Sequence, residues 1–509
     1  MFYVVASAAA ALSFFLYSLY QYLLPKPIPG IPYNVDATKN LLGDIPRLQK
    51  EANTNVYGWL INQTRIHKSP IIQAFIEPFH QPSVLVADFH EGQDILMRRK
   101  EFERSDFSIA LLSGEAPNFH INIKTGPEWK AHRRLLQDLM TPKFLHGVAA
   151  PNIYKSSARL LDLWKIKAQA AAGHAFQADM DIFYAALDAV FDFGFGDAIE
   201  QRALIPQLEK VAAAGTPNNA DDNNAIEFPS APIDPSFQAT LNSVENVGPV
   251  AASGFPKLAW WLVGWRPSVQ RNRAILDKFI KEQVMKAVDR YKNEGADDND
   301  DYVKSAIDLM LLRSKHEAAV ADGRAPTYAE IVQTSIPYLD ALVEEMLRLA
   351  HTTIIQERQA SEDTIVLGHR IPKGTNVFVA NQGASFTEPA FDIPNPLRSE
   401  SCKNAMEERG MRSWNEDGMN KFWPERWLVS NKETGEQVFD SAAGPTIPFG
   451  LGLRGCFGRR LAYMELKLLV TLLVWTFEFL PCSKELSTYE DVEGLTRKPK
   501  QCYVNLKVL

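Results

Sequence analysis

Residues 449–458 constrain this chain more than any other stretch. They read Phe-Gly-Leu-Gly-Leu-Arg-Gly-Cys-Phe-Gly, and a long apolar helical pattern follows directly. Cys456 is therefore expected on a tight loop at a helix N-terminus, where the helix dipole and free backbone N–H groups favour a thiolate. The glycines let the backbone approach a flat ligand, and Arg454 can pair with an anionic group on it. A lone soft thiolate suits the iron of a haem better than zinc, which needs three or four ligands.

The alternative for Cys456 is a buried, small apolar residue in front of a core helix, which is a common role for a cysteine. The pattern F-G-x-G-x-R-x-C-x-G fixes too many residue types for chance to be a good explanation. The stretch resembles the haem-binding loop of the cytochrome P450 family. The resemblance implies that Cys456 is the axial ligand of a haem b (iron protoporphyrin IX). It also implies that Phe449 and Arg454 belong to the cofactor site.

Composition narrows the class of protein. The chain has 509 residues, of which 46% are hydrophobic and 23% are charged, as in ordinary globular proteins. The net charge of −7 gives no basic surface for nucleic acid, so we expect no nucleic-acid partner. The four cysteines show no metal-type or disulfide-rich spacing, which favours a reducing compartment.

Residues 2–24 contain no charge and are rich in Ala, Leu, Val, Phe and Tyr. A helix of this length spans about 35 Å, enough for a bilayer core of roughly 30 Å. We therefore predict a single-pass transmembrane anchor over residues 1–24, with the chain after Lys26 in the cytosol. The alternative is a cleaved signal peptide, which the missing basic n-region and the long apolar run disfavour. Residues 25–33 hold four prolines and predict a stiff hinge.

Residues 126–140 form a helical pattern that places Trp129 and Arg133 on one face. A surface amphipathic helix is the plain interpretation. Beside the cysteine loop, however, Trp129-x-x-x-Arg133 resembles the family helix whose Trp and Arg hold a haem propionate. Arg358 stands where family members carry a second propionate-binding arginine. A guanidinium is a fork-shaped match to a carboxylate, so both assignments are chemically sensible.

A second helical pattern covers residues 339–349 and puts Glu345 and Arg348 three positions apart, as neighbours on the helix surface. Such a pair is usually a solvated salt bridge of small value. The sequence Phe-Trp-Pro-Glu-Arg-Trp offers Arg426 as a third partner. Glu345, Arg348 and Arg426 together resemble the family's structural Glu-Arg-Arg triad, which braces the haem loop.

The remaining patterns predict secondary structure. Residues 71–75 and 84–87 are expected to form a small hairpin, and residues 364–379 a second one that turns at 370–375. Residues 267–292 and 459–480 are expected to be helices, the latter stopped by Pro481. Residues 255–265 gather three tryptophans; this segment either dips into a membrane surface and lines a route for a lipophilic substrate or belongs to the core.

One family feature is missing. The family carries a distal helix with an acid–alcohol pair about 50 residues before the Glu-x-x-Arg helix, whereas this chain has an acidic, solvated stretch near Gly295. Residues 302–310 look helical, and residues 311–317 resemble the segment that follows the distal helix. We therefore expect tens of residues to be absent near 310–311, through a natural loss, a splice form or a gene-model error.

The sequence predicts a mainly α-helical protein with small β-sheets and the cytochrome P450 fold, with an incomplete distal side. Residues 34–509 are expected to be the haem-thiolate domain, at the endoplasmic reticulum membrane. The resemblance implies NADPH- and O₂-dependent monooxygenation of a lipophilic small molecule, with electrons from NADPH-cytochrome P450 reductase, in fungal secondary metabolism. Two alternatives stay open: a haem-thiolate isomerase or dehydratase, and a non-catalytic truncated chain.

Overall fold

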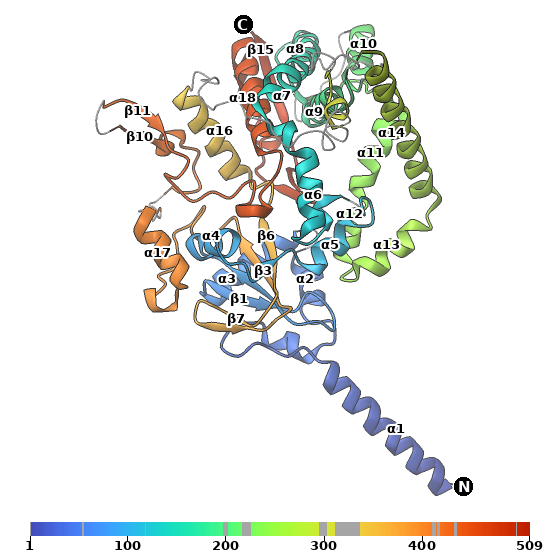
Figure 1. The fold of residues 1–509 in the computed structure, drawn as a ribbon, viewed down its shortest axis with the longest axis vertical. Coiled ribbons are helices and arrows are strands. Elements are labelled where there is room, and N and C mark those ends of the chain that lie inside the picture. Colours follow the sequence, from blue (N-terminus) through green and yellow to red (C-terminus); the bar gives the residue numbers. More distant parts are fainter. Residues whose placement is uncertain are drawn as a thin grey trace.

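The computed structural model of the chain describes residues 2–52, 55–117, 119–196, 202–215, 225–294, 303–310, 336–409, 414, 418–431, 435–494 and 496–509. Helices dominate these residues, and the strands gather in small sheets (Figure 1). The mainly α-helical fold with small sheets is therefore confirmed. The acidic stretch at residues 295–302 and the segment 311–335 lie outside the described residues.

The helices have the following bounds: α1 Phe2–Leu23, α2 Ile45–Glu51, α3 Val56–His67, α4 Phe89–Met97, α5 Asp106–Leu112, α6 Pro127–Leu136, α7 Pro142–Phe144, α8 Ala150–Ala171, α9 Asp179–Phe195, α10 Leu204–Ala214, α11 Pro235–Glu245, α12 Val247–Ala252, α13 Pro256–Gly264, α14 Pro267–Glu294, α16 Pro337–Ala350, α17 Glu400–Arg409 and α18 Arg459–Thr476. The helices predicted over 126–140, 267–292 and 339–349 are confirmed as α6, α14 and α16. Prolines open α6, α13 and α16 at the first turn, where the missing N–H costs nothing.

The largest sheet has five strands in the order β1-β2-β9-β6-β3. Its strands are β1 Ile71–Ala74, β2 Ser83–Val86, β9 Asn376–Ala380, β6 Ile355–Ala360 and β3 Phe102–Glu103. The predicted hairpin is confirmed as the antiparallel pair β1–β2, while β9 joins β2 in parallel. Apolar cores cover both faces: Val84 and Val379 belong to one, Leu85 and Phe378 to the other. This explains the uninterrupted apolar runs of these strands.

The smaller sheets join distant parts of the chain. A four-stranded sheet has the order β12-β15-β4-β5 and is built from β12 Phe477–Leu480, β15 Tyr503–Val508, β4 Ala175–Gln177 and β5 Ala225–Ile226. Three two-stranded sheets pair β7 Thr364–Val366 with β8 His369–Ile371, β10 Leu428–Ser430 with β11 Gln437–Phe439, and β13 Asp491–Glu493 with β14 Arg497–Pro499.

Two predicted boundaries were wrong. The helix expected over 459–480 ends at Thr476, because Phe477–Leu480 pairs with β15 instead of continuing the helix. The hairpin expected to turn at 370–375 closes earlier, between β7 and β8, where Leu367 and Gly368 both have positive φ. Leucine is rarely found in that conformation, so Leu367 does not predict a turn and Gly368 alone marks it. The predicted turn does exist, but it leads from β8 into the five-stranded sheet.

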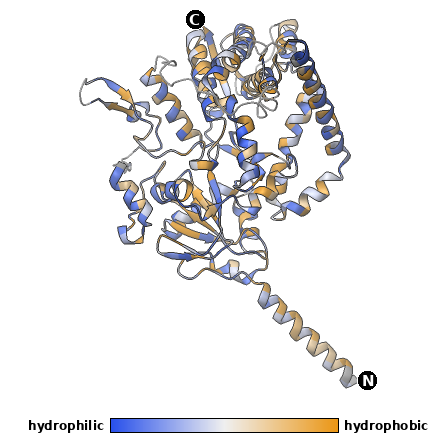
Figure 2. Cartoon of the chain, in the orientation of Figure 1, coloured by the Kyte–Doolittle hydropathy of each residue, from blue (hydrophilic) through white to orange (hydrophobic). Residues whose placement is uncertain are grey.

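The N-terminal helix α1 projects from the body of the protein (Figure 1) and carries no charged side chain. Hydropathic colouring shows it apolar along most of its length, with paler positions between (Figure 2). Serines, tyrosines and Gln21 interrupt its apolar surface. None of the helices in the described part of the chain combines the length and the apolarity needed to cross a bilayer. The structure therefore gives no support for the transmembrane anchor predicted over residues 1–24.

Candidate functional site

The cysteine loop is held by its own backbone. The N–H of Cys456 donates to the carbonyl of Phe449 at 2.7 Å, and the N–H of Gly455 donates to the carbonyl of Gly452 at 3.1 Å. Helix α18 begins at Arg459, three residues after the cysteine. The loop thus presents the sulfur in front of a helix N-terminus, as the sequence predicts, where negative charge is favoured.

Helix α4 packs very closely against this loop. Gly452 has φ of +66°, and a Cβ built on it would lie 2.4 Å from the carbonyl oxygen of Leu96 in α4. Only glycine tolerates both the left-handed conformation and this approach. The contact with the C-terminal end of α4 therefore fixes the position of the cysteine loop relative to that helix.

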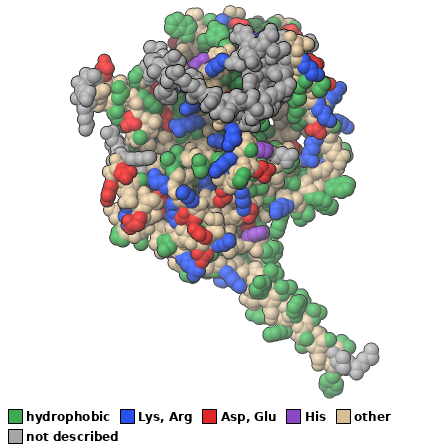
Figure 3. Space-filling view, viewed as in Figure 1, with side chains coloured by type: hydrophobic (Ala, Val, Ile, Leu, Met, Phe, Trp, Pro, Cys, Tyr) green, Lys and Arg blue, Asp and Glu red, His purple; other side chains and the backbone are tan. Residues whose placement is uncertain are grey.

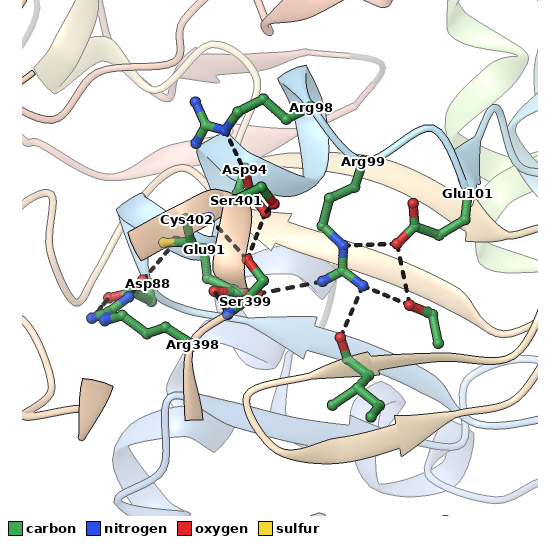
Figure 4. Close-up of polar contacts among 12 residues, drawn as sticks. Asp88, Glu91, Asp94, Arg98, Arg99, Glu101, Arg398, Ser399, Ser401 and Cys402 are labelled. Carbon is green, nitrogen blue, oxygen red and sulfur yellow. Dashed lines mark hydrogen bonds and ion pairs between the residues drawn. The ribbon is translucent and has the colours of Figure 1, made fainter. Parts of the chain in front are cut away.

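Helix α4 is itself clamped to α17 by a buried polar network (Figure 4). The carboxylate of Asp94 accepts the hydroxyl hydrogens of Ser399 and Ser401, both at 2.7 Å. At the other end of α4, Arg398 donates to both oxygens of Asp88, at 2.7 and 3.2 Å. Such two-pronged contacts fix orientation as well as distance. The network thus fixes α4 relative to α17, and α4 in turn contacts the cysteine loop.

A cavity of about 920 Å³ opens beside the loop. All six residues that the sequence predicts for the cofactor site line it: Trp129, Arg133, Arg358, Phe449, Arg454 and Cys456. Its walls also include side chains of α5, α11 and β6. Segments more than 300 residues apart in the sequence thus meet around one space.

Positive charge concentrates on this cavity. Burial, together with the neighbouring Arg104 and Arg454, lowers the pKa of Arg358 to about 10. Burial and the charge of Arg454 also lower the pKa of Arg133. Arg454 pairs with Glu103 at 2.9 Å, whereas the buried Nε of Arg104 has no hydrogen-bond partner among the described residues. An anionic ligand would relieve this crowding of guanidinium groups.

Aromatic rings separate the arginines. The guanidinium groups of Arg133 and Arg454 lie 5.5 and 4.8 Å from the ring centre of Trp129. Arg133 also lies 4.7 Å from the ring centre of Phe457, the residue after the cysteine. These cation–π contacts hold the two arginines at the cavity wall without neutralising them.

The Glu-Arg-Arg triad is assembled in the interior. Both carboxylate oxygens of Glu345 accept hydrogen bonds from Arg348, at 2.7 and 2.8 Å, and Arg426 lies 3.4 Å from one of them. Although burial acts to raise the pKa of Glu345, the contacts with Arg348 and Trp427 outweigh it and the pKa is lowered. The prediction that these three residues meet is confirmed.

Sequence reasoning missed several partners in the site. Trp414 faces the guanidinium groups of both Arg348 and Arg426, at 5.4 and 4.7 Å from its ring centre. Trp427 donates from Nε1 to Glu345 at 2.9 Å. The cavity also holds Arg104 and His120, whose pKa falls to about 4 through burial and the charge of Arg133. Trp427 could have been found in the Phe-Trp-Pro-Glu-Arg-Trp motif, but no local signal marks the other three.

The fold and this site define a class: a mainly helical protein with one cysteine loop facing an arginine-rich cavity, the arrangement of a haem-thiolate protein. The family model described as Cytochrome P450 matches residues 312–398 and 419–506. The chain is 36% identical to cytochrome P450 monooxygenase TRI13 of Fusarium sporotrichioides, over 96% of this chain and 97% of that protein. It is 32% identical to cytochrome P450 monooxygenase xilC of Penicillium crustosum, over 97% of this chain and 94% of that protein.

A solved cytochrome P450, CYP102L1, superposes with a TM-score of 0.60 at 18% identity, over 95% of this chain and 100% of that one, and so agrees in fold. The chain belongs to the cytochrome P450 family. Its relatives are monooxygenases, which are oxidoreductases. Membership implies a haem cofactor. The residues present fit one, because the cavity combines an accessible cysteine with several guanidinium groups, one of them with an unpartnered Nε, and guanidinium groups suit propionates.

Proposed function

We propose that this chain is a haem-thiolate monooxygenase that oxidises a lipophilic small molecule and carries haem b in the arginine-rich cavity. The convergence of Cys456 with Arg133, Arg358 and Arg454 on one cavity carries the proposal. When bound, the haem supplies oxygen-activating chemistry, with electrons from NADPH through NADPH-cytochrome P450 reductase. We place this activity in fungal secondary metabolism, in keeping with the similarity to fungal monooxygenases.

In this proposal the chain's own residues hold and orient the cofactor. The Cys456 sulfur would bind the haem iron from its place in front of the N-terminus of α18. Trp129 and Arg133 would bind one propionate and Arg358 the other, while Arg454 would supply further positive charge to the anionic edge of the cofactor. The unpartnered Nε of Arg104 adds a further donor on the same wall.

A carbon-monoxide difference spectrum of the reduced protein tests the proposal. We expect the red-shifted band of a thiolate-ligated haem, and we expect Cys456→Ala to abolish it. Cys402→Ala is the matched control, because that cysteine is buried between α4 and α17 and does not line the cavity. A wild-type protein without the band, or a band that survives in Cys456→Ala, would contradict the assignment.

A second candidate is a haem-thiolate isomerase or dehydratase. The sequence shows no distal acid–alcohol pair in front of the Glu-x-x-Arg helix, and a rearrangement of an already oxidised substrate needs no proton delivery to oxygen. The two candidates separate by cofactor demand. Turnover that proceeds without NADPH and reductase supports the isomerase, whereas strict dependence on both supports the monooxygenase.

We also propose that tens of residues are absent from this chain near positions 310–311. The alignment with the Fusarium protein extends over 572 positions, which exceeds this chain of 509 residues by 63. The alignment must therefore place gaps in this chain at no fewer than 63 positions. Sequencing the transcript across the codons for Met310 and Leu311 tests this. An uninterrupted transcript together with absent haem binding would support the third reading, a non-catalytic chain.

We also propose that the protein associates with the endoplasmic reticulum membrane, with the catalytic domain in the cytosol. Two surfaces support this. Hydrophobic side chains cover the projecting α1 (Figure 3). In α13, Trp260 is buried and donates to the Leu111 carbonyl at 2.8 Å, whereas Trp261 is 61% exposed. The segment 255–265 is thus both core and surface. Flotation with liposomes, compared for the full chain and a chain lacking residues 1–24, tests the association.

A further inference from the structure

The cavity wall contains a carboxyl group directly beside one of its arginines. Glu357 lines the cavity wall from strand β6, next to Arg358. Because successive side chains of a strand point to opposite faces, the two side chains point in opposite directions. Glu357 therefore faces α5 and away from its arginine neighbour.

The environment of Glu357 is built for a carboxyl group. Ser105 donates its hydroxyl hydrogen to one carboxylate oxygen and Ser108 donates to the other. Burial dominates and raises the pKa of Glu357 to about 7, despite these two hydrogen bonds. A carboxylate offers about four acceptor positions, so about half remain after the serines are satisfied.

A second polar side chain stands at the same part of the cavity. Tyr57 lines the cavity from α3, and its pKa is raised by burial and by the nearby charges of Glu357 and Glu493. Within the described residues its hydroxyl makes no hydrogen bond. Glu493 is engaged by the backbone N–H groups of Tyr57 and Gly58, both at 2.9 Å. Glu357 and Tyr57 therefore keep hydrogen-bonding capacity in this cavity, as does the Nε of Arg104, whose charge acts on Glu357.

The cavity lining also includes apolar side chains. Leu111 and Leu112 of α5, with Val244 and Val247 from the region of α11 and α12, line the cavity. A ligand bound here has an apolar body that these side chains cover. Its hydrogen-bonding group can then reach the carboxyl group of Glu357.

We propose that Glu357, with Tyr57, forms a polar subsite that selects apolar substrates bearing a hydroxyl group, which donates its hydrogen to the carboxyl group. The inference rests on the proposed function, since it names the substrate class of that same cavity. A site with acceptor positions left over discriminates against a molecule that cannot donate a hydrogen bond, because those remaining positions then stay without a partner.

Two probes of nearly equal shape test the proposal: 1-adamantanol, which donates a hydrogen bond, and 1-fluoroadamantane, which does not. Their dissociation constants are measured by calorimetry on the haem-loaded protein. We expect the wild type to prefer the alcohol by about 10-fold. Glu357→Leu should reduce the preference to about 2-fold or less, and Tyr57→Phe should reduce it in part. The isosteric Glu357→Gln keeps the side-chain volume and should retain only a weakened preference.

Gln359→Leu is the matched control, because Gln359 lies two residues along the same strand and outside the cavity lining. It should keep the wild-type preference. A preference that is absent in the wild type, unchanged in both Glu357 variants or lost equally in the control overturns the subsite. A structural role of Glu357 alone would change folding without changing the alcohol-to-fluoride ratio. A wild type without the carbon-monoxide band would instead count against the haem proposal, and the ratio measured on the haem-free protein would then test the subsite separately.

Discussion

The geometry of the cysteine loop requires a glycine at position 452. Gly452→Ala places a methyl group against the Leu96 carbonyl in a left-handed conformation, so we expect a loss of about 1–3 kcal/mol in the free energy of unfolding, together with weaker haem retention. Gly458→Ala is the control, since its φ is −80° and a Cβ there meets nothing within 4 Å. Urea denaturation measures both variants. Equal losses would mean that the α4 contact does not set the loop.

His351 makes stability depend on pH. Burial, with the charges of Arg497 and Arg348, lowers its pKa from 6.5 to about 4. Between these values the unfolded chain binds a proton that the folded protein does not, so stability falls as the pH drops from about 6.5 toward 4. The slope from this residue approaches roughly 1.4 kcal/mol per pH unit. His351→Gln should flatten the pH profile of urea midpoints in this window, and an unchanged slope would contradict the assignment.

Helix α16 depends on its buried ion pair. Arg348→Met leaves the carboxylate of Glu345 buried without its principal partner, which typically costs about 3–5 kcal/mol. Glu345 has a lowered pKa, so its contribution is present above its unfolded pKa and is lost as the pH falls through its folded value. We therefore expect the difference between wild type and Arg348→Met to shrink in acid. The exposed pair Arg370–Asp363 supplies the control Arg370→Ala, which should leave the denaturation midpoint unchanged.

The same element connects stability to the site. Glu345 also accepts the backbone N–H of Trp423 at 3.0 Å, and Arg348 donates to the Phe386 carbonyl at 2.8 Å. One helix thus holds two segments that lie outside the regular helices and strands. A buried charge network of this kind is costly to break, although it need not be more stable than an apolar core.

On the scale of the whole molecule, we expect one substitution in the arginine-rich cavity to have different effects on the protein without haem and on the protein with haem. Without haem, Arg358→Leu removes a buried cation crowded by Arg104 and Arg454, so we expect the thermal midpoint of the apoprotein to stay level or rise. With haem, the same change should weaken cofactor binding by about 10-fold, the effect of losing a charged hydrogen bond. Gln359→Leu, away from the cavity, should do neither. A fall in both states would assign Arg358 a structural role.

Much of the site could be predicted because its signals are local. The cysteine loop, the Trp129–Arg133 spacing and the Glu345–Arg348 spacing each lie within one turn or one loop, where backbone geometry fixes the neighbours. The prediction for residues 477–480 failed because sheet pairing with β15 decides that conformation. The structure does not support the transmembrane prediction for residues 1–24, because α1 is not apolar enough over the required length.

The sequence by itself determined the cysteine loop, the helices that begin at their prolines and the buried strand runs, since each depends on residues close together in the chain. Only the tertiary structure brought Arg104 beside Arg358, set Trp414 against the two triad arginines and joined Glu357 to Ser105 and Ser108. These contacts cross long sequence separations, and no spacing rule specifies them. They form because folding brings charged and polar groups into a shared interior, where each must find a partner or a ligand.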